Sequence, residues 1–574
     1  MIKTMTKYSF VLLNGEKDEF LQELQELGVV DIKRSARPID EVSADMLSEI
    51  EGIQAKIKCI KEGSDSELVA MQDKLSSLLK EEKELEVWGD YDKSKIERLG
   101  IKFYRVARKA FDPAWHEGYA LEIIEEGKDD ICFVIVGGDA GFPLTALPLP
   151  ERTVSEVKKE CAMVEEAIAV HKKGLEEQKG DIPALEEKLR TVSSELNLYL
   201  ARQTGETAAE DKLIVFTGFA PYEEKDRLCE AFDKMSIYYA AEEATLEDNP
   251  PIALKNNKFV AQFETLTEMY GMPVYNEFDP TVFLSIFFLL FFSICMGDAG
   301  YGILLTAIGL FLKGKEGGLA KMWSLVTTLG IGTIVVGLLL GGFFGINLPA
   351  QSWIPEPLRN YWAFMGGNVP GTTYSVQMVL SLVIGIIHIC LALVMKAVWA
   401  VRKKGVMGSL SDLGWTLLIV GGIIGLAVGL TGVISETAMK WLLIGIAAVS
   451  ALGIYIFNNP KRNPLVNVGA GLWDTYNMAS GLMGDVLSYI RLYALGLSGA
   501  MLAQTFNQIA EMVKGTDPTW QWLPFILILL VGHVLNLAMC CLGAFVHPLR
   551  LNFVEFFKNS GYEGMGKKYN PIRK

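Results

Sequence analysis

The sequence predicts a multi-domain chain in which N-terminal cytoplasmic α/β lobes are joined by a long antiparallel coiled coil and followed by a C-terminal all-α membrane domain of eight transmembrane helices. Three observations predict it: uneven charge, sustained apolar 3–4 spacing in the first half, and long apolar runs in the second. Of 68 acidic and 54 basic residues, positions 1–279 hold 57 and 35, a net charge of −22, whereas positions 280–574 carry +8. An acidic cytoplasmic arm, 1–279, is therefore joined to an apolar membrane domain, 280–574.

The proximal lobe is expected to combine residues 1–35 with residues 212–260. Residues 7–33 run as strand, turn, helix and strand, beginning with the apolar run Tyr8–Leu13, and residues 213–241 repeat that order. Two such units can complete one small α/β sandwich although they lie far apart in the sequence. The opening run is read as a buried strand and not as a signal peptide, because acidic residues follow it at once.

Two helical arms, at about 40–90 and 152–205, are predicted to form the coiled coil, and they flank a distal lobe at about 96–150 with strands near Ile101–Ala107 and Ile131–Val136. Apolar residues recur three and four positions apart in both arms, as in a coiled-coil seam. Gly180-Asp181 and Pro183 interrupt the second arm, so we expect a bend there. Because little apolar surface lies outside the seam, we favour an exposed mechanical strut over a helical hairpin in a packed domain.

No cofactor or metal site is expected. The eight cysteines include the adjacent pair Cys540 and Cys541 but no Cys-x-x-Cys, which indicates reduced thiols and no zinc or disulfide framework. The chain lacks a Gly-x-x-x-x-Gly-Lys-Ser/Thr loop, so it is not expected to hydrolyse ATP by that route. The acidic soluble half argues against nucleic acid as a partner.

From Pro280 onward, apolar stretches are long enough to cross a bilayer, which takes about 20 residues. The eight predicted spans are 281–297, 300–314, 323–345, 375–400, 411–431, 440–457, 470–511 and 521–556. With the N-terminal half in the cytoplasm, eight crossings return the C-terminus there. The predicted cytoplasmic segments then hold thirteen lysines and arginines and the outer loops three, in agreement with the positive-inside rule.

Three basic residues fall within spans: Lys396, Arg491 and Arg550. Lys396 lies near the end of the fourth span, where its stem can reach the headgroups. Arg491 lies deep in the seventh span, where an arginine costs about 2.5–3.5 kcal/mol and cannot escape by losing its proton. Asp485 lies six residues earlier and points about 120° away on an ideal helix, so it is not a local partner. Arg491 therefore needs a carboxylate or a water-filled cavity, which favours a functional role.

Polar residues line one face of the eighth span, within about 60° of one another at 100° per residue. They are His533, Asn536, Cys540 and His547, with Arg550 just beyond. In the seventh span Asp474 and Asp485 are eleven residues apart, which returns them to nearly the same face. Both precede Arg491 and lie on its cytoplasmic side, whereas His533 begins on the outer side. We therefore expect two offset polar half-paths, one open to each side, with Arg491 between them.

Four stretches carry a resemblance to a known family. They are Gly218-Phe219-Ala220-Pro221, the segment from Asn249-Pro250-Pro251 to Phe278-Asp279-Pro280, Met296-Gly297-Asp298-Ala299-Gly300-Tyr301-Gly302, and Ser488-Tyr489-Ile490-Arg491-Leu492-Tyr493-Ala494-Leu495. In these the chain resembles subunit I of bacterial and archaeal V/A-type ATPases, the counterpart of subunit a in eukaryotic vacuolar proton pumps. The likeness covers essentially the whole chain.

The resemblance implies a stator subunit that translocates ions against a membrane rotor ring whose subunits each carry one glutamate. The family's essential arginine falls on Arg491, its second arginine on Arg550, and the carboxylate of its Gly-Asp-x-Gly motif on Asp298. The resulting half-channel candidates are Asp298, Asp474, Asp485, Ser488, His533, Asn536, His547 and Glu555. The sequence also departs from the eukaryotic pattern, because Gly499 and Cys540 stand where that pattern has a histidine and a glutamate. The outer path of proton-pumping relatives therefore does not transfer intact, and both H⁺ and Na⁺ stay open.

The resemblance also implies partners and a location. The expected partners are the rotor ring of c/K-type subunits, peripheral-stalk subunits of the E/G type on the cytoplasmic arm, a central-stalk subunit of the d/C type, and the lipid bilayer. The expected location is the plasma membrane, in multi-pass form, with both termini cytoplasmic.

Two other classes of function compete with this interpretation. A secondary transporter with a cytoplasmic regulatory domain predicts internal repeats with broken helices, and no repeat is evident across the eight predicted spans. A coiled-coil scaffold without transport leaves two arginines within spans unexplained.

Overall fold

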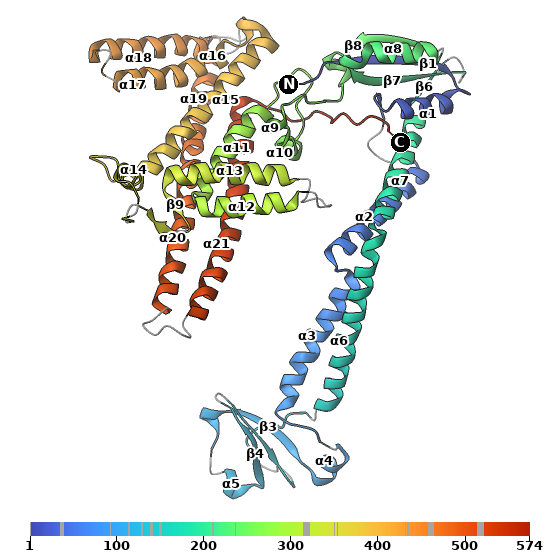
Figure 1. Cartoon of the computed structure of the whole chain (residues 1–574), viewed down its shortest axis with the longest axis vertical. Coiled ribbons are helices and arrows are strands. Elements are labelled where there is room, and N and C mark those ends of the chain that lie inside the picture. Colours follow the sequence, from blue (N-terminus) through green and yellow to red (C-terminus); the bar gives the residue numbers. More distant parts are fainter. Residues whose placement is uncertain are drawn as a thin grey trace. The chain divides into compact units, whose positions relative to one another are not determined.

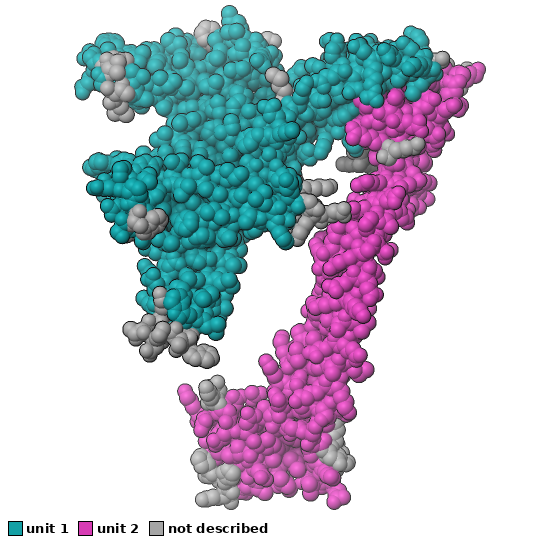
Figure 2. All heavy atoms as spheres, in the orientation of Figure 1, with its two compact units in different colours: residues 1–10, 217–570 teal, residues 11–216, 571–574 magenta. Residues whose placement is uncertain are grey.

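The computed structural model describes residues 2–34, 39–91, 93–112, 115–127, 130–137, 142–148, 152–208, 212–235, 237–313, 322–348, 351–352, 354–430, 432, 435–456, 464–513 and 522–573. The chain divides into two compact units, coloured in Figure 2. Unit 1 comprises Met1–Phe10 and Thr217–Asn570, and unit 2 comprises Val11–Phe216 and Pro571–Lys574. The domain limits expected from the sequence stay predictions. The end residues 314, 431, 457 and 521 of predicted spans lie outside the described residues.

The two strand–helix–strand repeats are confirmed (Figure 1). The elements are β1 (Met5–Leu13), α1 (Lys17–Leu27) and β2 (Asp31–Ile32) in the first, and β7 (Leu213–Pro221), α8 (Lys225–Lys234) and β8 (Tyr238–Glu243) in the second. The strand order is β2-β7-β1-β8, with β6 (Glu206–Ala208) paired to β7. In unit 1 the rings of Tyr8 and Phe10 lie 5.5 and 5.1 Å from that of Phe232, which fixes α8 against β1.

Four helices of unit 2 form two antiparallel pairs (Figure 1). They are α2 (Glu41–Glu62), α3 (Ser66–Glu86), α6 (Val154–Glu177) and α7 (Ile182–Gln203), with α3 against α6 and α2 against α7. Leu78 and Leu85 pack on Val157 and Cys161 in the first pair. In the second pair Ile50, Ile53 and Ile57 pack on Val192. These residues have the predicted spacing, while the supercoil of a coiled coil stays a prediction.

Both arms are interrupted. In the second arm a 3₁₀ segment, Gln178–Asp181, lies at the predicted break. The first arm also has a break, which was not predicted from the sequence: Gly63 adopts a left-handed conformation (φ 62°) between α2 and α3. Asp65 then caps α3 by accepting a bond from the Leu68 N–H at 2.8 Å, and its other oxygen lies 2.9 Å from His171 Nε2 on α6. These two bonds hold the pKa of Asp65 below its usual value.

The distal lobe contains an antiparallel three-stranded sheet in the order β3-β5-β4. Its elements are α4 (Lys93–Leu99), β3 (Lys102–Ala107), α5 (Trp115–Gly118), β4 (Leu121–Glu126) and β5 (Asp130–Ile135). Strands β3 and β5 lie where the sequence predicted them. Tyr104 and Phe133 are fully buried, with ring centroids 5.4 Å apart, and form the centre of this lobe.

Among the described residues, six helical stretches are long and apolar enough to cross a membrane. They are α13 (Trp323–Leu340), α15 (Val376–Gly408), α16–α17 (Leu410–Gly429), α18 with a π-helical end (Glu436–Ile456), α19–α20 (Val466–Val513) and α21–α22 (Trp522–Ser560). The first two predicted spans correspond to the shorter apolar helices α11 (Thr281–Met296) and α12 (Ala299–Leu312). A largely helical membrane region is thus confirmed, and the count of eight crossings stays a prediction.

The seventh predicted span is not one continuous helix. It consists of α19 (Pro464–Ser488) and α20 (Ile490–Val513), with Tyr489 between them. There the N–H of Tyr489 bonds to the carbonyl of Val486 at 3.1 Å, and the N–H of Leu492 to that of Tyr489 at 3.1 Å. These three-residue bonds tighten the helix as in a 3₁₀ turn. The ideal-helix angle between Asp485 and Arg491 expected from the sequence therefore does not hold across this turn.

Candidate functional site

A hydrogen-bonded network links α12, α20 and α21. The hydroxyl of Tyr301 lies 2.8 Å from Nδ1 of His533, whose Nε2 lies 3.0 Å from Oδ1 of Asn507. The amide of Asn536 donates to the Tyr301 hydroxyl at 2.9 Å and to the carbonyl of Gly499 at 3.0 Å. Tyr301 and Asn536 are buried. The predicted polar stripe of the eighth span therefore has partners on two other helices.

Next to this network lies a cavity of about 490 Å³. His533 and Asn507 line it together with three further polar side chains of α20, Gln504, Gln508 and Glu511. These α20 residues were not predicted from the sequence. Their recurrence at three- and four-residue intervals is the signal that would have found them, since it places polar groups on one helix face.

Asp298 serves a different role from the other candidate carboxylates. Its Oδ1 accepts the N–H groups of Gly300 at 2.8 Å and Tyr301 at 3.2 Å, and its Oδ2 accepts the N–H of Gly345 at 3.1 Å. It caps the first turn of α12 and ties that helix to the loop after α13. The side chain is only 3% exposed. Asp298 is thus primarily a helix cap, with its charge close to His533.

A cluster of acidic residues lies near the start of α20. Asp485, 8% exposed, accepts a bond from the amide of Asn559 at 2.7 Å and lies 3.8 Å from the ammonium of Lys558. Glu555 lies near Ser488 and within reach of the charges of Asp485 and Arg550. Glu555 Oε2 is buried and has no hydrogen-bond partner among the described residues. Buried carboxylates so arranged can exchange a cation or proton with a neighbour.

A second cavity, of about 440 Å³, adjoins this cluster. Asp474 and Asp485 both line it, so the two residues share one space as their eleven-residue spacing predicted. Lys396 also lines it, and its ammonium lies 3.1 Å from a carboxylate oxygen of Asp412. Lys396 therefore pairs with a neighbouring helix. Among the described residues, no group of three His, Cys, Asp or Glu side chains is placed to hold a metal ion.

Arg491 lies on α20, two residues after the tightened turn. Its side chain is half-buried. It forms no ion pair with a carboxylate of the described residues, so its charge is not neutralised within that part of the chain. His547 of α21 lies close enough to feel the charges of both Arg491 and Arg550. The structure thus brings Arg491 and Arg550 close to His547, and no ion pair joins Arg491 to Asp485.

The end of α21 explains how Arg550 and Glu555 reach this region. Pro548 lies inside α21 and has no N–H to donate to the preceding turn. The helix then widens into a π-helical segment, Leu551–Phe556, and the buried amide of Asn552 donates to the carbonyl of Pro548 at 2.8 Å. Such widened turns recur at functional sites, because they redirect side chains that a regular helix would point elsewhere.

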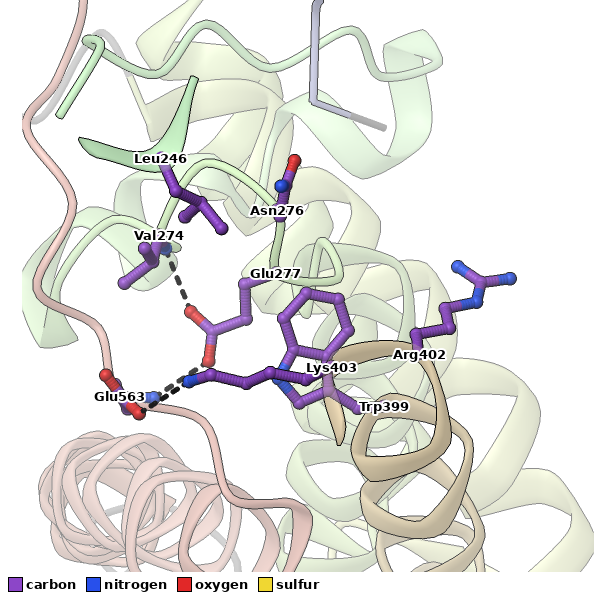
Figure 3. A pocket seen from close by; sticks show the side chains of 8 residues that line it. All are labelled: Leu246, Val274, Asn276, Glu277, Trp399, Arg402, Lys403 and Glu563. Carbon is purple, nitrogen blue, oxygen red and sulfur yellow. Dashed lines mark hydrogen bonds and ion pairs between the residues drawn. The ribbon is translucent and has the colours of Figure 1, made fainter. Parts of the chain in front are cut away.

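A third cavity, of about 410 Å³, lies outside this region, at the segment that enters α11 (Figure 3). Glu277 accepts N–H groups of Val274 and Glu563, each at 2.9 Å, while Lys403 lies 3.7 Å from the Glu563 carboxylate. Burial raises the pKa of Glu277, and the two N–H bonds oppose that rise. Since both acids are engaged and no candidate half-channel residue lines this cavity, it joins segments of unit 1 and does not extend the site.

These observations define a class: a multi-pass membrane protein with two polar networks, each beside its own cavity, and a half-buried arginine that has no carboxylate partner among the described residues. Comparison with known proteins identifies the family. Residues 150–346 match the V-type ATPase 116kDa subunit family. The "A-type ATP synthase subunit I" of Methanocaldococcus jannaschii is 32% identical over 455 residues, which cover 74% of this chain and 64% of that protein.

Two bacterial proteins align over their full length and that of this chain. The "V-type ATP synthase subunit I 1" of Treponema pallidum is 26% identical over 646 aligned positions. The "V-type ATP synthase subunit I" of Borreliella burgdorferi is 25% identical over 621. The chain belongs to this V/A-type ATPase subunit I family. Several archaeal relatives are longer, and the aligned part of this chain covers about half of the two Pyrococcus proteins.

Proposed function

We propose that the chain is the membrane stator subunit of a rotary V/A-type ATPase and that Arg491 is the fixed charge against which a rotor ring exchanges its ions. One observation carries the proposal: a half-buried guanidinium within an apolar span, with no carboxylate partner among the described residues. An arginine in such a place stays charged and costs free energy unless it gains a partner. A carboxylate that moves past from another subunit would supply that partner.

The charge of Arg491 favours the ionised form of a passing ring carboxylate. At 4 Å and an effective dielectric constant of 20, the attraction is about 4 kcal/mol. An energy of that size changes the equilibrium constant for ion release from the carboxylate about a thousandfold, since 1.36 kcal/mol corresponds to a factor of ten. The ion is thereby released into one half-path before the carboxylate reloads from the other.

We assign the two half-paths to the two cavities. The cytoplasmic half-path begins at the 440 Å³ cavity lined by Asp474 and Asp485 and passes Glu555. The outer half-path begins at the 490 Å³ cavity and passes His533. Tyr301 and Asn536 continue it by hydrogen bonds toward Cys540, where relatives that pump protons have a glutamate. This route uses residues that the chain does possess and needs no histidine at Gly499.

In this proposal the chain binds no nucleotide, and its partners supply ATP chemistry. The rotor ring of c/K-type subunits faces α20 and α21 in a bilayer. The long helical pairs of unit 2 receive E/G-type peripheral-stalk subunits and resist the torque of rotation, while a d/C-type subunit contacts the stator centrally. The chain then couples ATP hydrolysis or synthesis to H⁺ or Na⁺ transport in the plasma membrane, with both termini cytoplasmic.

Replacement of Arg491 tests the function. In complexes reconstituted into vesicles, Arg491→Ala should abolish ATP-driven ion transport while the subunit still assembles, because the ring carboxylate loses the charge that releases its ion. Arg491→Lys should also fail in large part, because an ammonium is a point donor that can lose its proton when buried. Arg359→Ala, on helix α14 (Glu356–Gly366), is the matched control and should transport normally.

Wild-type transport by an assembled Arg491→Ala complex would contradict the proposal. Transport by the purified chain without ATP-hydrolysing partners would favour the secondary-transporter alternative. Repeating the assay with and without Na⁺ identifies the ion.

A further inference from the structure

His388 is a buried polar group that the proposed ion path does not use. It lies on α15 and is fully buried, with Nδ1 2.9 Å from the hydroxyl of Tyr489. Its Nε2 has no hydrogen-bond partner among the described residues. A buried nitrogen without a partner costs about 1–3 kcal/mol, so an apolar residue would serve simple packing better. The position therefore calls for a role besides packing.

Tyr489 connects His388 to the turn before Arg491. Tyr489 is fully buried and is the residue between α19 and α20. Its ring fills space left by a glycine of α15, since a Cβ at Gly385 would lie 2.6 Å from Cδ2 of Tyr489. The ring and the hydroxyl of Tyr489 are thus both held by α15, on successive turns of one helix face.

The same imidazole also holds the segment that carries Glu555. The rings of His388 and Phe556 stack with centroids 4.6 Å apart and planes 3° from parallel. Phe556 directly follows Glu555 in the π-helical segment, and Tyr489 directly follows Ser488, which lies near Glu555. His388 therefore contacts the residue after Glu555 and the residue after Ser488, which places it between the two segments that carry them.

The contacts that hold Tyr489 against α15 also determine the direction of the Arg491 side chain. Two residues correspond to a rotation of about 200° in an α-helix and about 240° in a 3₁₀ turn, so their side chains lie on roughly opposite sides in either case. With Tyr489 held toward α15, Arg491 points to the opposite side, where His547 of α21 feels its charge. Loss of the Tyr489 anchor would let the tightened turn relax and change both the depth and the direction of the guanidinium.

We propose that His388 is a positioning residue for ion translocation: through the hydroxyl of Tyr489 and the ring of Phe556 it fixes Arg491 relative to Glu555. This inference rests on the proposed function of Arg491. His388 does not touch the ion. It acts as a neutral hydrogen-bond partner and a flat stacking surface at the point where the seventh span tightens.

The test measures ions transported per ATP hydrolysed in the complete complex reconstituted into vesicles. Tyr489→Phe removes only the hydroxyl, and His388→Phe removes the hydrogen bond but keeps a planar ring against Phe556. Each variant should lower the ratio by roughly two- to tenfold, the range expected for one hydrogen bond. The double variant should be no worse than either single variant, because both remove the same bond.

Thr416→Val is the matched control. It removes another hydroxyl bonded to α15, at 3.2 Å from the Leu393 carbonyl, but away from the tightened turn. Its ratio should equal that of the wild type. An unchanged ratio in assembled Tyr489→Phe complexes would overturn the proposal, and so would losses of assembly and transport in equal proportion. Arg491→Ala is measured alongside to separate the two claims. If Arg491→Ala transports normally, the proposed function of Arg491 is contradicted. If Arg491→Ala is inactive while Tyr489→Phe and His388→Phe keep the wild-type ratio, only the proposed role of His388 is contradicted.

Discussion

At the scale of single residues, the carboxylates of the membrane region differ in what their oxygens contact. Both oxygens of Asp298 accept backbone N–H groups, three in all, so the fold engages both of them. Asp485 has side-chain partners, Asn559 and Lys558, and borders a cavity. Side-chain partners and open space let a carboxylate exchange ions, whereas backbone partners hold it in place. This contrast separates the helix cap Asp298 from Asp485, which we propose as a half-path residue, although both are buried aspartates.

Replacement of Asp298 should therefore act on stability more than on transport. Asp298→Ala leaves three backbone N–H groups without their acceptor, those of Gly300, Tyr301 and Gly345. From the usual costs of a lost cap and of buried unpaired donors, we expect a destabilisation on the order of 3 kcal/mol. Asp298→Asn keeps one oxygen and should cost less. Thermal unfolding of the purified subunit in detergent measures the difference.

The outcome that contradicts this assignment is specific. It is an Asp298→Ala chain that unfolds at the wild-type temperature but transports fewer ions per ATP. That result would place Asp298 in the ion path, where its Gly-Asp-x-Gly motif led us to expect it from the sequence.

At the scale of elements, α12 and α13 approach closely through glycines. A Cβ on Gly330 would lie 2.6 Å from the backbone nitrogen of Thr306, and one on Gly309 would lie 2.8 Å from that of Thr327. Small residues let helices pack backbone to backbone in a membrane, where apolar side chains gain nothing over lipid. This close contact places α12, which carries Tyr301, beside a helix long enough to span the bilayer.

Gly330→Ala should push these two helices apart. The added Cβ would clash with backbone atoms of Thr306, which have little room to move. We therefore expect a loss of about 1–3 kcal/mol in stability, as for other overpacked sites. Gly445→Ala, on α18, is the matched control because a Cβ added there would have no atom within 4 Å. Its stability should equal or exceed that of the wild type. Equal stability of the two variants in detergent-melting experiments would refute the backbone contact.

Helix periodicity predicted the apolar helices and the helices of both arms, since apolar spacing is a local property of the sequence. The helix breaks divide into two kinds. The break at Gln178–Asp181 was predicted because glycine and proline mark it locally. The turn at Tyr489 was not predicted, because the contacts of Tyr489 are with His388 and Gly385, about a hundred residues earlier. A tyrosine in an apolar run carries no such signal by itself.

At the scale of the whole molecule, the candidate site also depends on residues that no sequence pattern joins. Arg491 was predicted as a site residue because a charged guanidinium in an apolar span costs free energy. Asp474 and Asp485 were predicted because their spacing places them on nearly the same helix face. The partners of Asp485, Lys558 and Asn559, lie more than seventy residues later and are ordinary surface residue types. Long-range pairing of this kind follows only from the packed structure.

The orientation in the membrane gives the last prediction. Helix α15 (Val376–Gly408) is long and apolar enough to cross, so positions beside its two ends should lie on opposite sides. Tyr374 precedes it and is 58% exposed, and Met407 lies at its other end and is 78% exposed. With the N-terminal half in the cytoplasm, Tyr374→Cys should react with a membrane-impermeant maleimide in intact cells. Met407→Cys should react only after the membrane is permeabilised, with the parent chain as the baseline for native cysteines. The reverse pattern would invert the topology and exchange the sides assigned to the two cavities, whereas labelling of both positions in intact cells would mean that α15 does not cross.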